Sequence, residues 1–183
     1  MRPGYLADLP GLIAARIATH LPELRQCEGM AGRFDLAELQ TVAVRAPAVL
    51  VARLGSSMPR PLAGPHYIYS LRMAAFVVTK DVPGLARDAA AAAICQALLQ
   101  RIPDATWGID GLGPAADVAD QSLSGGAQKA KGVTIWAVTW TQPTTLEQLP
   151  PQAVIPVSLY VSQAPHIGAD HEGDYDLIGS FGE

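Results

Sequence analysis

The strongest constraint on the fold is a long run of aromatic and β-branched residues that stands directly before an alanine-rich stretch. The run from Tyr67 to Thr79 has the composition of a strand of about a dozen residues. Asp81-Val82-Pro83-Gly84 breaks this run, and apolar side chains then recur at helical spacing from Leu85 to Arg101. These two neighbouring segments predict a helix packed on a sheet.

Other segments complete this outline. Apolar residues three and four positions apart predict an N-terminal helix from about Leu9 to His20, with Asp8 as its N-cap. Short apolar or β-branched runs predict strands over residues 48–54, 118–123, 132–141 and 154–161. Proline and glycine predict a loop or irregular strand over 22–32, loops over 56–65 and 103–114, and a linker over 143–151. The order predicts an α+β fold, a mostly antiparallel sheet of about four to five strands with two helices packed on one face.

Charge is distributed unevenly along the 183 residues. Residues 1–131 carry all 13 Lys and Arg residues, whereas residues 132–183 carry 6 of the 17 acidic residues and no base. We expect an α+β domain over residues 1–145 and a proline-containing, acidic C-terminal extension over 146–183, with the last fifteen or so residues ordered only by a partner. Neither part has the basic stripe that sequence-specific DNA-binding proteins show.

The cellular compartment follows from the apolar runs and the cysteines. No apolar run approaches the roughly 20 residues that a membrane-spanning helix needs, and the N-terminus has no signal-peptide pattern. Cys27 and Cys95 lie far apart without metal-binding spacing, so we expect two reduced thiols. These features predict a chain made in the cytoplasm with no membrane partner.

Two polar segments are the candidates for chemistry. Residues 125–131 contain glycines and lysines without phosphate-loop spacing, so a flexible hairpin loop is favoured over a nucleotide site. Its tip residues Gln128, Lys129 and Lys131 could instead face a polyanion. Potential metal ligands gather only in the C-terminal segment, at His166, Asp170, His171, Glu172, Asp174 and Asp176. Their spacing matches no calcium loop, and a solvated acidic tail is favoured over a metal site.

Motifs of catalysis are missing from the sequence. There is no nucleophile elbow, and none of the four histidines has a motif around it. We therefore expect no enzyme activity, no cofactor and no metal, and keep a small-molecule or metal-binding module or hydrolase as an alternative of a different class. Trp136 and Trp140 share one face of the late strand, where they are either core residues or a subunit contact.

Several segments together resemble a known family. They are Leu21-Pro22-Glu23-Leu24, Glu28-Gly29-Met30-Ala31-Gly32, Arg45-Ala46-Pro47-Ala48-Val49-Leu50-Val51, Phe76-Val77-Val78-Thr79-Lys80 and Trp136-Ala137-Val138-Thr139-Trp140. With the alanine-rich helix between them, they make the chain similar to the tail terminator family of Mu-like phages and prophages over about residues 5–141.

The resemblance implies a structural protein of the virion without an active site. Terminators form a ring, taken to be a homo-hexamer, on the last ring of the tail tube protein, stop tube growth and offer a docking face to the head-tail connector or neck protein. In a contractile tail the sheath protein is a further partner, and DNA passes through the lumen without sequence-specific binding. Assembly then takes place in the host cytoplasm, and the protein ends at the head-proximal end of the tail. A neck or head-completion protein of similar fold is the alternative.

Three sets of residues become candidates under this resemblance. The loop residues Gln128, Lys129 and Lys131 are candidates for facing the channel. The acidic residues of the C-terminal segment are candidates for binding a partner, and they are Asp170, Glu172, Asp174 and Asp176. Trp136 and Trp140 are candidates for a subunit contact.

Overall fold

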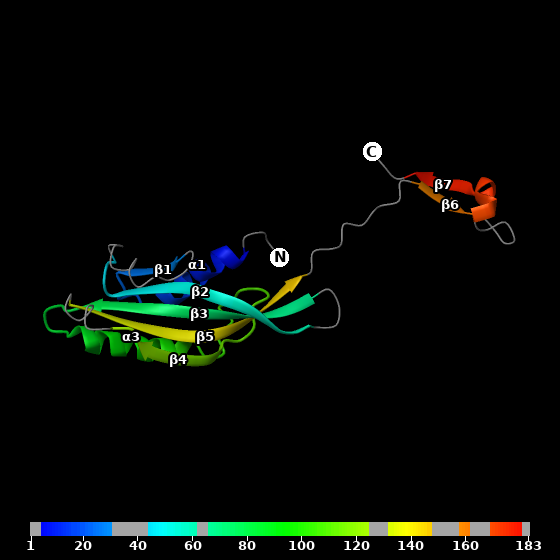
Figure 1. Cartoon of the computed structure of the whole chain (residues 1–183). Coiled ribbons are helices and arrows are strands. Elements are labelled where there is room, and N and C mark those ends of the chain that lie inside the picture. The colour runs from blue at the N-terminus through cyan, green and yellow to red at the C-terminus, as the bar shows by residue number, and fades with distance from the viewer. Residues whose placement is uncertain are drawn as a thin grey trace. The chain divides into compact units, whose positions relative to one another are not determined.

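A five-stranded sheet forms the centre of the first of two compact units, residues 1–148 (Figure 1). The computed structural model describes residues 5–30, 44–61, 66–124, 132–147, 158–161 and 169–180. The elements of the first unit are α1 (Tyr5–Ala18), β1 (Gln26–Met30), β2 (Ala48–Pro61), β3 (His66–Lys80), α3 (Arg87–Arg101), β4 (Ala116–Ser122) and β5 (Val133–Glu147). The strand order is β1-β2-β3-β5-β4, with β1 parallel to β2 and the other pairs antiparallel. The predicted α+β fold is confirmed.

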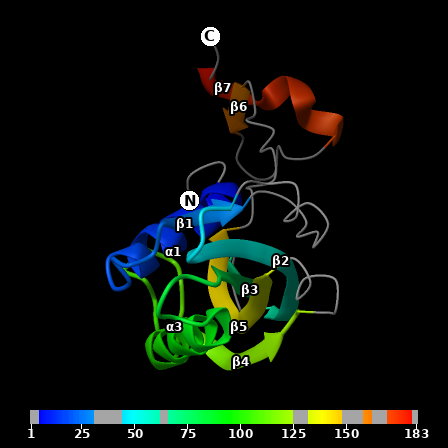
Figure 2. The same cartoon turned by 90° about the vertical axis from the view of Figure 1, so that its left-hand side faces the viewer.

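Both helices pack on the same face of this sheet, as Figure 2 shows. Leu9, Ile13 and Ile17 of α1 and Ala91, Cys95 and Leu98 of α3 lie in one buried cluster. The strands contribute the alternate residues that point to this face, which are Val49, Val51, Leu71, Met73, Ala75, Val77, Val138 and Trp140. The core therefore lies between the helices and the sheet, as the sequence predicts.

The opposite face of the sheet is apolar as well. The intervening residues of the same strands form a second buried cluster, which includes Leu50, Ala74, Phe76, Val78 and Ala137. A strand buried on both faces has a continuous apolar run instead of alternating polar residues. This explains why Ala74 to Val78 contains no polar residue.

Two strands extend through proline-containing segments that we expected to be a loop and a linker. β2 continues to Pro61, paired with β3, with irregular register between Arg53 and Gly55 and between Ser57 and Arg60. On its other side, β2 pairs with β1 only over Ala48–Ala52, so among the described residues the rest of β2 is an edge, where a missing N–H is tolerated. Likewise, β5 continues to Glu147 beyond Thr141, where its pairing with β4 ends. Loop residues lie beside this part of β5, and the Gly113 N–H donates to the Pro143 carbonyl at 2.8 Å, so this contact does not need an N–H on Pro143. The loop prediction for 56–61 and the linker prediction for 143–147 are wrong.

The other boundaries differ less. α1 begins at Tyr5 and ends at Ala18, so Asp8 lies in its first turn and is not the N-cap. Tyr5 and Leu6 pack against the core, and this tertiary contact stabilises the extra turn. Residues 26–30, expected as loop or irregular strand, form β1 beside β2. The predicted helix over 85–101 is confirmed as α3.

The second unit, residues 149–183, contains a small two-stranded sheet. It is formed by β6 (Ser158–Val161) and β7 (Asp176–Ser180), with the short 3-10 helix η1 (Ala169–Asp174) before β7. Tyr160 pairs with Leu177 across the two strands, and their side chains are 55% and 54% exposed. Most of the last fifteen or so residues, which we expected to be ordered only by a partner, thus form η1 and β7. Within the described ranges of the whole chain, no helix is long and apolar enough to cross a membrane.

Candidate functional site

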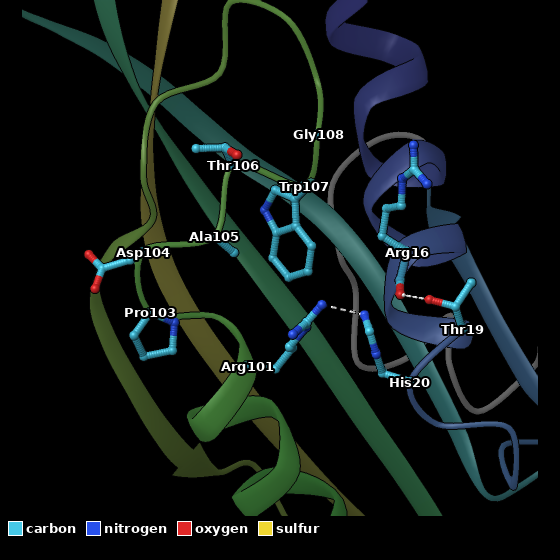
Figure 3. Close-up of a pocket in the computed structure, with 10 residues that line it drawn as sticks. All are labelled: Arg16, Thr19, His20, Arg101, Pro103, Asp104, Ala105, Thr106, Trp107 and Gly108. Carbon is cyan, nitrogen blue, oxygen red and sulfur yellow. Dashed lines mark hydrogen bonds between the residues drawn. The ribbon is translucent and has the colours of Figure 1, made fainter.

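A polar pocket of about 580 Å³ lies where the C-terminal ends of α1 and α3 meet the loop after α3 (Figure 3). The C-terminal end of α1 provides Arg16, and the residues after it provide Thr19 and His20. The last residue of α3 provides Arg101, and Trp107 comes from the loop. The other lining residues belong to the same loop and are Pro103, Asp104, Ala105, Thr106 and Gly108.

Helix ends explain why basic groups gather here. The C-terminal end of a helix carries partial negative charge, so cations are favoured in its last turn. Arg16 occupies the last turn of α1, and Arg101 occupies the last turn of α3. Thr19 Oγ1 donates a hydrogen bond of 2.7 Å to the Arg16 carbonyl and so closes the end of α1. Since both helices end beside the same loop, Arg16 and Arg101 both line this cavity.

The lining of the pocket holds one carboxylate, that of Asp104, and it forms no ion pair with Arg16 or Arg101. Arg101 Nη2 lies 2.5 Å from His20 Nε2. A guanidinium can only donate, so the imidazole nitrogen accepts this hydrogen bond through its lone pair. In the described part of the chain, neither Arg16 nor Arg101 forms an ion pair with a carboxylate. The ion pair that is present there joins Arg87 and Asp81, at the other end of α3. The pocket is therefore suited to a ligand with negative charge.

The loop wall of the pocket has a strained backbone. Asp104 and Trp107 have positive φ angles of 59° and 58°, a conformation that residues with a Cβ rarely adopt. Such conformations persist where surrounding contacts hold them, and they cluster at functional sites. In this loop the contacts come from β5.

A buried glutamine of β5 holds the loop in place. Gln142 is fully buried, and its Oε1 accepts hydrogen bonds from Trp107 Nε1 at 3.0 Å and from Trp140 Nε1 at 2.9 Å. Its Nε2 donates to the Ala105 carbonyl at 3.1 Å and to the Gly113 carbonyl. Both lone pairs and both protons of the amide are thus used, which fixes the loop between α3 and β4 to the sheet.

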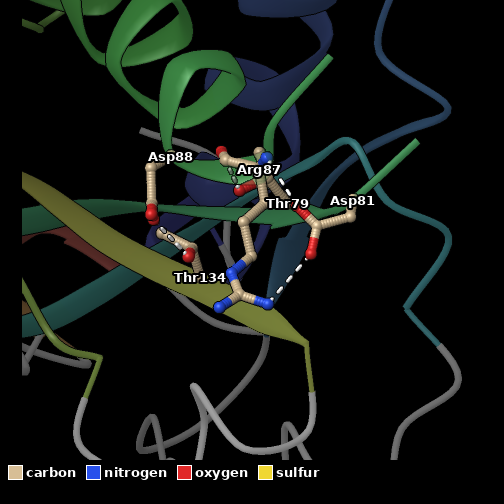
Figure 4. Close-up of polar contacts among 5 residues, drawn as sticks. All are labelled: Thr79, Asp81, Arg87, Asp88 and Thr134. Atoms are coloured by element: carbon tan, nitrogen blue, oxygen red, sulfur yellow. Dashed lines mark hydrogen bonds and ion pairs between the residues drawn. The ribbon is translucent and has the colours of Figure 1, made fainter. Parts of the chain in front are cut away.

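The other end of α3 is fixed by polar contacts with β3 and β5 (Figure 4). Asp81 accepts hydrogen bonds from the backbone N–H and from Nη1 of Arg87, both at 3.0 Å. Thr79 Oγ1 donates to the Arg87 carbonyl at 2.9 Å, and Thr134 Oγ1 donates to Asp88 Oδ1 at 2.7 Å. These contacts define where α3 begins and hence where Arg101 lies at its end.

A smaller groove of about 210 Å³ adjoins the polar pocket. His20 and Arg101 line both, so the groove and the pocket lie next to each other at these two side chains. The groove adds mainly apolar groups and one amide from α1, its following turn and α3, namely Ile17, Leu21, Ala97, Leu98 and Gln100. A ligand that combines a carboxylate or phosphate with an apolar side chain matches the two together.

None of the described residues singled out from the sequence is among those that line the pocket. Gln128, Lys129 and Lys131 are outside the described residues, as is His166. Asp170 in η1 and Asp176 at the start of β7 are exposed, whereas Glu172 and Asp174 are placed only as residues of η1. The described residues contain no group of three or more His, Cys, Asp or Glu side chains that could hold a metal ion.

The two tryptophans of β5 differ in exposure. Trp140 is 2% exposed and packs on Trp107 with 6.3 Å between ring centroids. A side chain this buried cannot be a subunit contact, so that alternative is wrong for Trp140, and the core alternative holds. Trp136 is half-buried at the margin of the same core.

The two thiols are poor nucleophiles. Burial raises the pKa of the Cys27 thiol and of the Cys95 thiol, in each case to about 11. Since the thiolate is the reactive form, both side chains stay protonated and unreactive near neutral pH.

The pocket itself was missed in the sequence, where His20 was assigned only to the end of the first helix. The available signal was that each predicted helix ends in basic residues, Arg16 with His20 in one case and Arg101 in the other. Nothing in the sequence shows that these two ends meet.

Comparison with known proteins adds no family assignment. No family model matches the chain, and no curated protein matches its sequence.

Proposed function

We propose that this protein is a phage tail terminator, a ring of identical subunits that caps the tail tube, stops its polymerisation and docks the head connector. The observation that carries the proposal is the small sheet of the second unit. A two-stranded sheet is marginally stable by itself in water, yet β6 and β7 expose Tyr160 and Leu177 side by side. Such a sheet needs the surface of another protein to cover it.

A second apolar surface supports the same proposal. Leu54 and Met58, which are 45% and 47% exposed, lie on the part of β2 that β1 does not cover. The chain therefore has two different exposed apolar surfaces, one on β6 and β7 and one on β2. Two different surfaces favour head-to-tail contacts between copies, and such contacts close into a ring when the rotation between subunits allows it. The resemblance of residues 5–141 to Mu-like tail terminators makes the tail tube the partner that fits best.

The proposal gives the protein a place in the virion. It would be assembled in the host cytoplasm and remain at the head-proximal end of the tail, between the tube and the connector. DNA would pass through the ring, with Gln128, Lys129 and Lys131 as the candidates for residues that face it. Charge reversal at Lys129 and Lys131 should then impair DNA ejection, and an unchanged phage titre would refute this role of the loop.

Tube length provides the direct test. The cognate tail-tube protein is polymerised with and without the full chain, and tube lengths are measured by electron microscopy. Addition of the wild-type chain should shorten the tubes and stop their growth. The double variant Leu54→Ser/Met58→Ser should lose this effect, whereas Leu85→Ser should keep it. Leu85 is 49% exposed but lies at the β3–α3 corner, which makes it a matched control.

Two outcomes would contradict the proposal. Unchanged tube lengths at saturating protein would exclude a terminator, and binding of the same protein to connector rings would then favour a neck or head-completion protein. Loss of capping in the Leu85 variant to the same extent would show that the effect does not depend on the exposed part of β2.

A further inference from the structure

We infer that the pocket formed by Arg16, His20 and Arg101 binds the acidic segment 169–180 of a second copy of this chain. The inference rests on the proposed function, because it supplies the contact between neighbouring subunits of the ring. It assigns a ligand to a cavity that no feature of the tail-terminator resemblance involves.

The pocket carries more basic than acidic groups, since its lining holds two arginines and one carboxylate, that of Asp104. Two guanidinium groups line the same cavity, one of them hydrogen-bonded to an imidazole, and neither is paired with a carboxylate in the described part of the chain. The helix ends explain why cations are tolerated there, but two helix ends alone do not need a cavity of about 580 Å³ between them. A carboxylate ligand would use both the charge and the space, since an arginine fork binds carboxylates with two parallel hydrogen bonds.

Charge is complementary between the two units of the chain. Residues 132–183 contain six acids and no lysine or arginine, and five of these acids follow residue 148. Asp170 and Asp176 are exposed in the second unit. The first unit therefore offers the basic cavity, and the second unit offers carboxylates in a sequence without lysine or arginine.

The apolar groove beside the pocket fits the same ligand. Ile17, Leu21 and Leu98 line this groove, and it meets the pocket at His20 and Arg101. The acidic segment carries a matching apolar group, because Leu177 directly follows Asp176 and is 54% exposed. Binding in the groove would cover the Leu177 side chain, which is exposed to water in the isolated second unit. Nucleic acid would match the charge of the pocket but not the groove.

A ring follows if each copy gives its acidic segment to the next copy. The contact is then head-to-tail, since the pocket and the segment are different surfaces of the chain. Each subunit makes the contact twice, once with its pocket and once with its segment, so a closed ring leaves neither surface unused.

The test is a charge exchange between full-length chains, followed by sedimentation velocity. Two double variants are made: R16E/R101E reverses the pocket, and D170K/D176K reverses the segment. Each alone should self-associate at least about tenfold more weakly than the wild type. The variant R72E/K80E is the matched control, because it reverses two exposed cations on β3 and should associate like the wild type.

Mixing the two double variants decides the identity of the ligand. In an equimolar mixture, the reversed pocket of one variant meets the reversed segment of the other, and the two unreversed surfaces also meet. An alternating ring of even subunit number then has every contact restored, so the mixture should associate within about threefold of the wild type. A folding defect cannot produce this rescue, since it would persist in the mixture.

Several results would overturn the inference. Mixing without rescue, or wild-type association in R16E/R101E, would show that the pocket does not bind this segment of a second copy. Loss of binding to a labelled DNA duplex in R16E/R101E, with self-association unchanged, would assign the pocket to nucleic acid instead.

The tube assay separates this inference from the proposed function. If R16E/R101E associates and caps tubes like the wild type, the inference fails and the terminator proposal stands. If charge exchange rescues association but the wild-type ring never caps tubes, the inference stands and the terminator proposal fails.

Discussion

Replacing Gln142 by Met should destabilise the first unit and release the loop between α3 and β4, which forms one side of the pocket. Methionine has a similar length and volume but no hydrogen-bonding amide. The substitution therefore keeps the packing and removes four hydrogen bonds, two accepted from the indoles of Trp107 and Trp140 and two donated to the carbonyls of Ala105 and Gly113.

The size of the effect follows from the groups left without partners. An unsatisfied buried donor or acceptor costs about 1–3 kcal/mol. The Ala105 carbonyl keeps a hydrogen bond from the Ala115 N–H at 3.1 Å, so three of the four groups lose their partner. Taking the lower value for each of these three groups gives a loss of about 3 kcal/mol in the free energy of unfolding. For a chain of this length, about 2–4 °C of Tm is lost per kcal/mol, so we expect the Tm to fall by about 6–12 °C.

The assay is thermal unfolding followed by circular dichroism, with tryptophan fluorescence as a second probe because two of the partners are indoles. Gln121→Met is the control, since Gln121 is exposed on β4, and its Tm should change by no more than about 2 °C. A Tm within about 3 °C of the wild type for Gln142→Met would refute the claim that this amide holds the loop.

Three further predictions concern other parts of the first unit. Gly29→Ala should cost about 1–3 kcal/mol in chemical unfolding, because a Cβ at this position would lie 2.3 Å from the backbone nitrogen of Gly11, which cannot move aside. Asp81→Ala should cost about 1–2 kcal/mol in the same assay, because it removes two hydrogen bonds to Arg87 at the start of α3. At pH 8, Cys95 should react with a disulfide reagent about a hundredfold more slowly in the folded protein than in urea, because burial raises its pKa from 9.0 to about 11. The same shift means that the free energy of unfolding falls as the pH rises from 9 towards 11, since the unfolded chain loses this proton first.

Each of these predictions has a control within the chain. Gly11→Ala adds a Cβ that meets nothing within 4 Å in α1, so it should stabilise the protein by about 0.5–1 kcal/mol. A destabilised Gly11 variant or a neutral Gly29 variant would contradict the close approach of α1 and β1. For Asp81, an equal loss in Asp110→Ala, which changes an exposed loop acid, would exclude a specific role at the helix start. For Cys95, equal rates in folded and unfolded protein would contradict burial of the thiol.

The sequence predicted the elements that local composition determines. The β-branched run of β3 and the alanine-rich run of α3 are unambiguous. Because the two runs are adjacent in the sequence, they already predict a helix packed on a sheet. The segments around Pro61 and Pro143 were misassigned because proline is compatible with an edge strand, and edges are defined by where the neighbouring strand stops. That information lies in the pairing of β1 and β4, not in the segments themselves.

The pocket could not be predicted for a similar reason. His20 and Arg101 are 81 positions apart, and only the packing of α1 and α3 on one face of the sheet brings them into contact. Gln142 gave no signal either, since a single glutamine beside Pro143 is typical of a linker. Its burial depends on two tryptophans whose positions are set by the fold. By contrast, the uneven distribution of charge along the chain could be read from the sequence. The basic cavity that we propose as the binding site of the acidic segment could not.

The central claim is that this chain forms rings that cap tail tubes. Electron microscopy of the purified full-length protein, mixed with its tail-tube protein, tests this most directly. We expect six-fold rings at one end of each tube and none along its sides. Tubes with bare ends beside a protein that stays monomeric would contradict it.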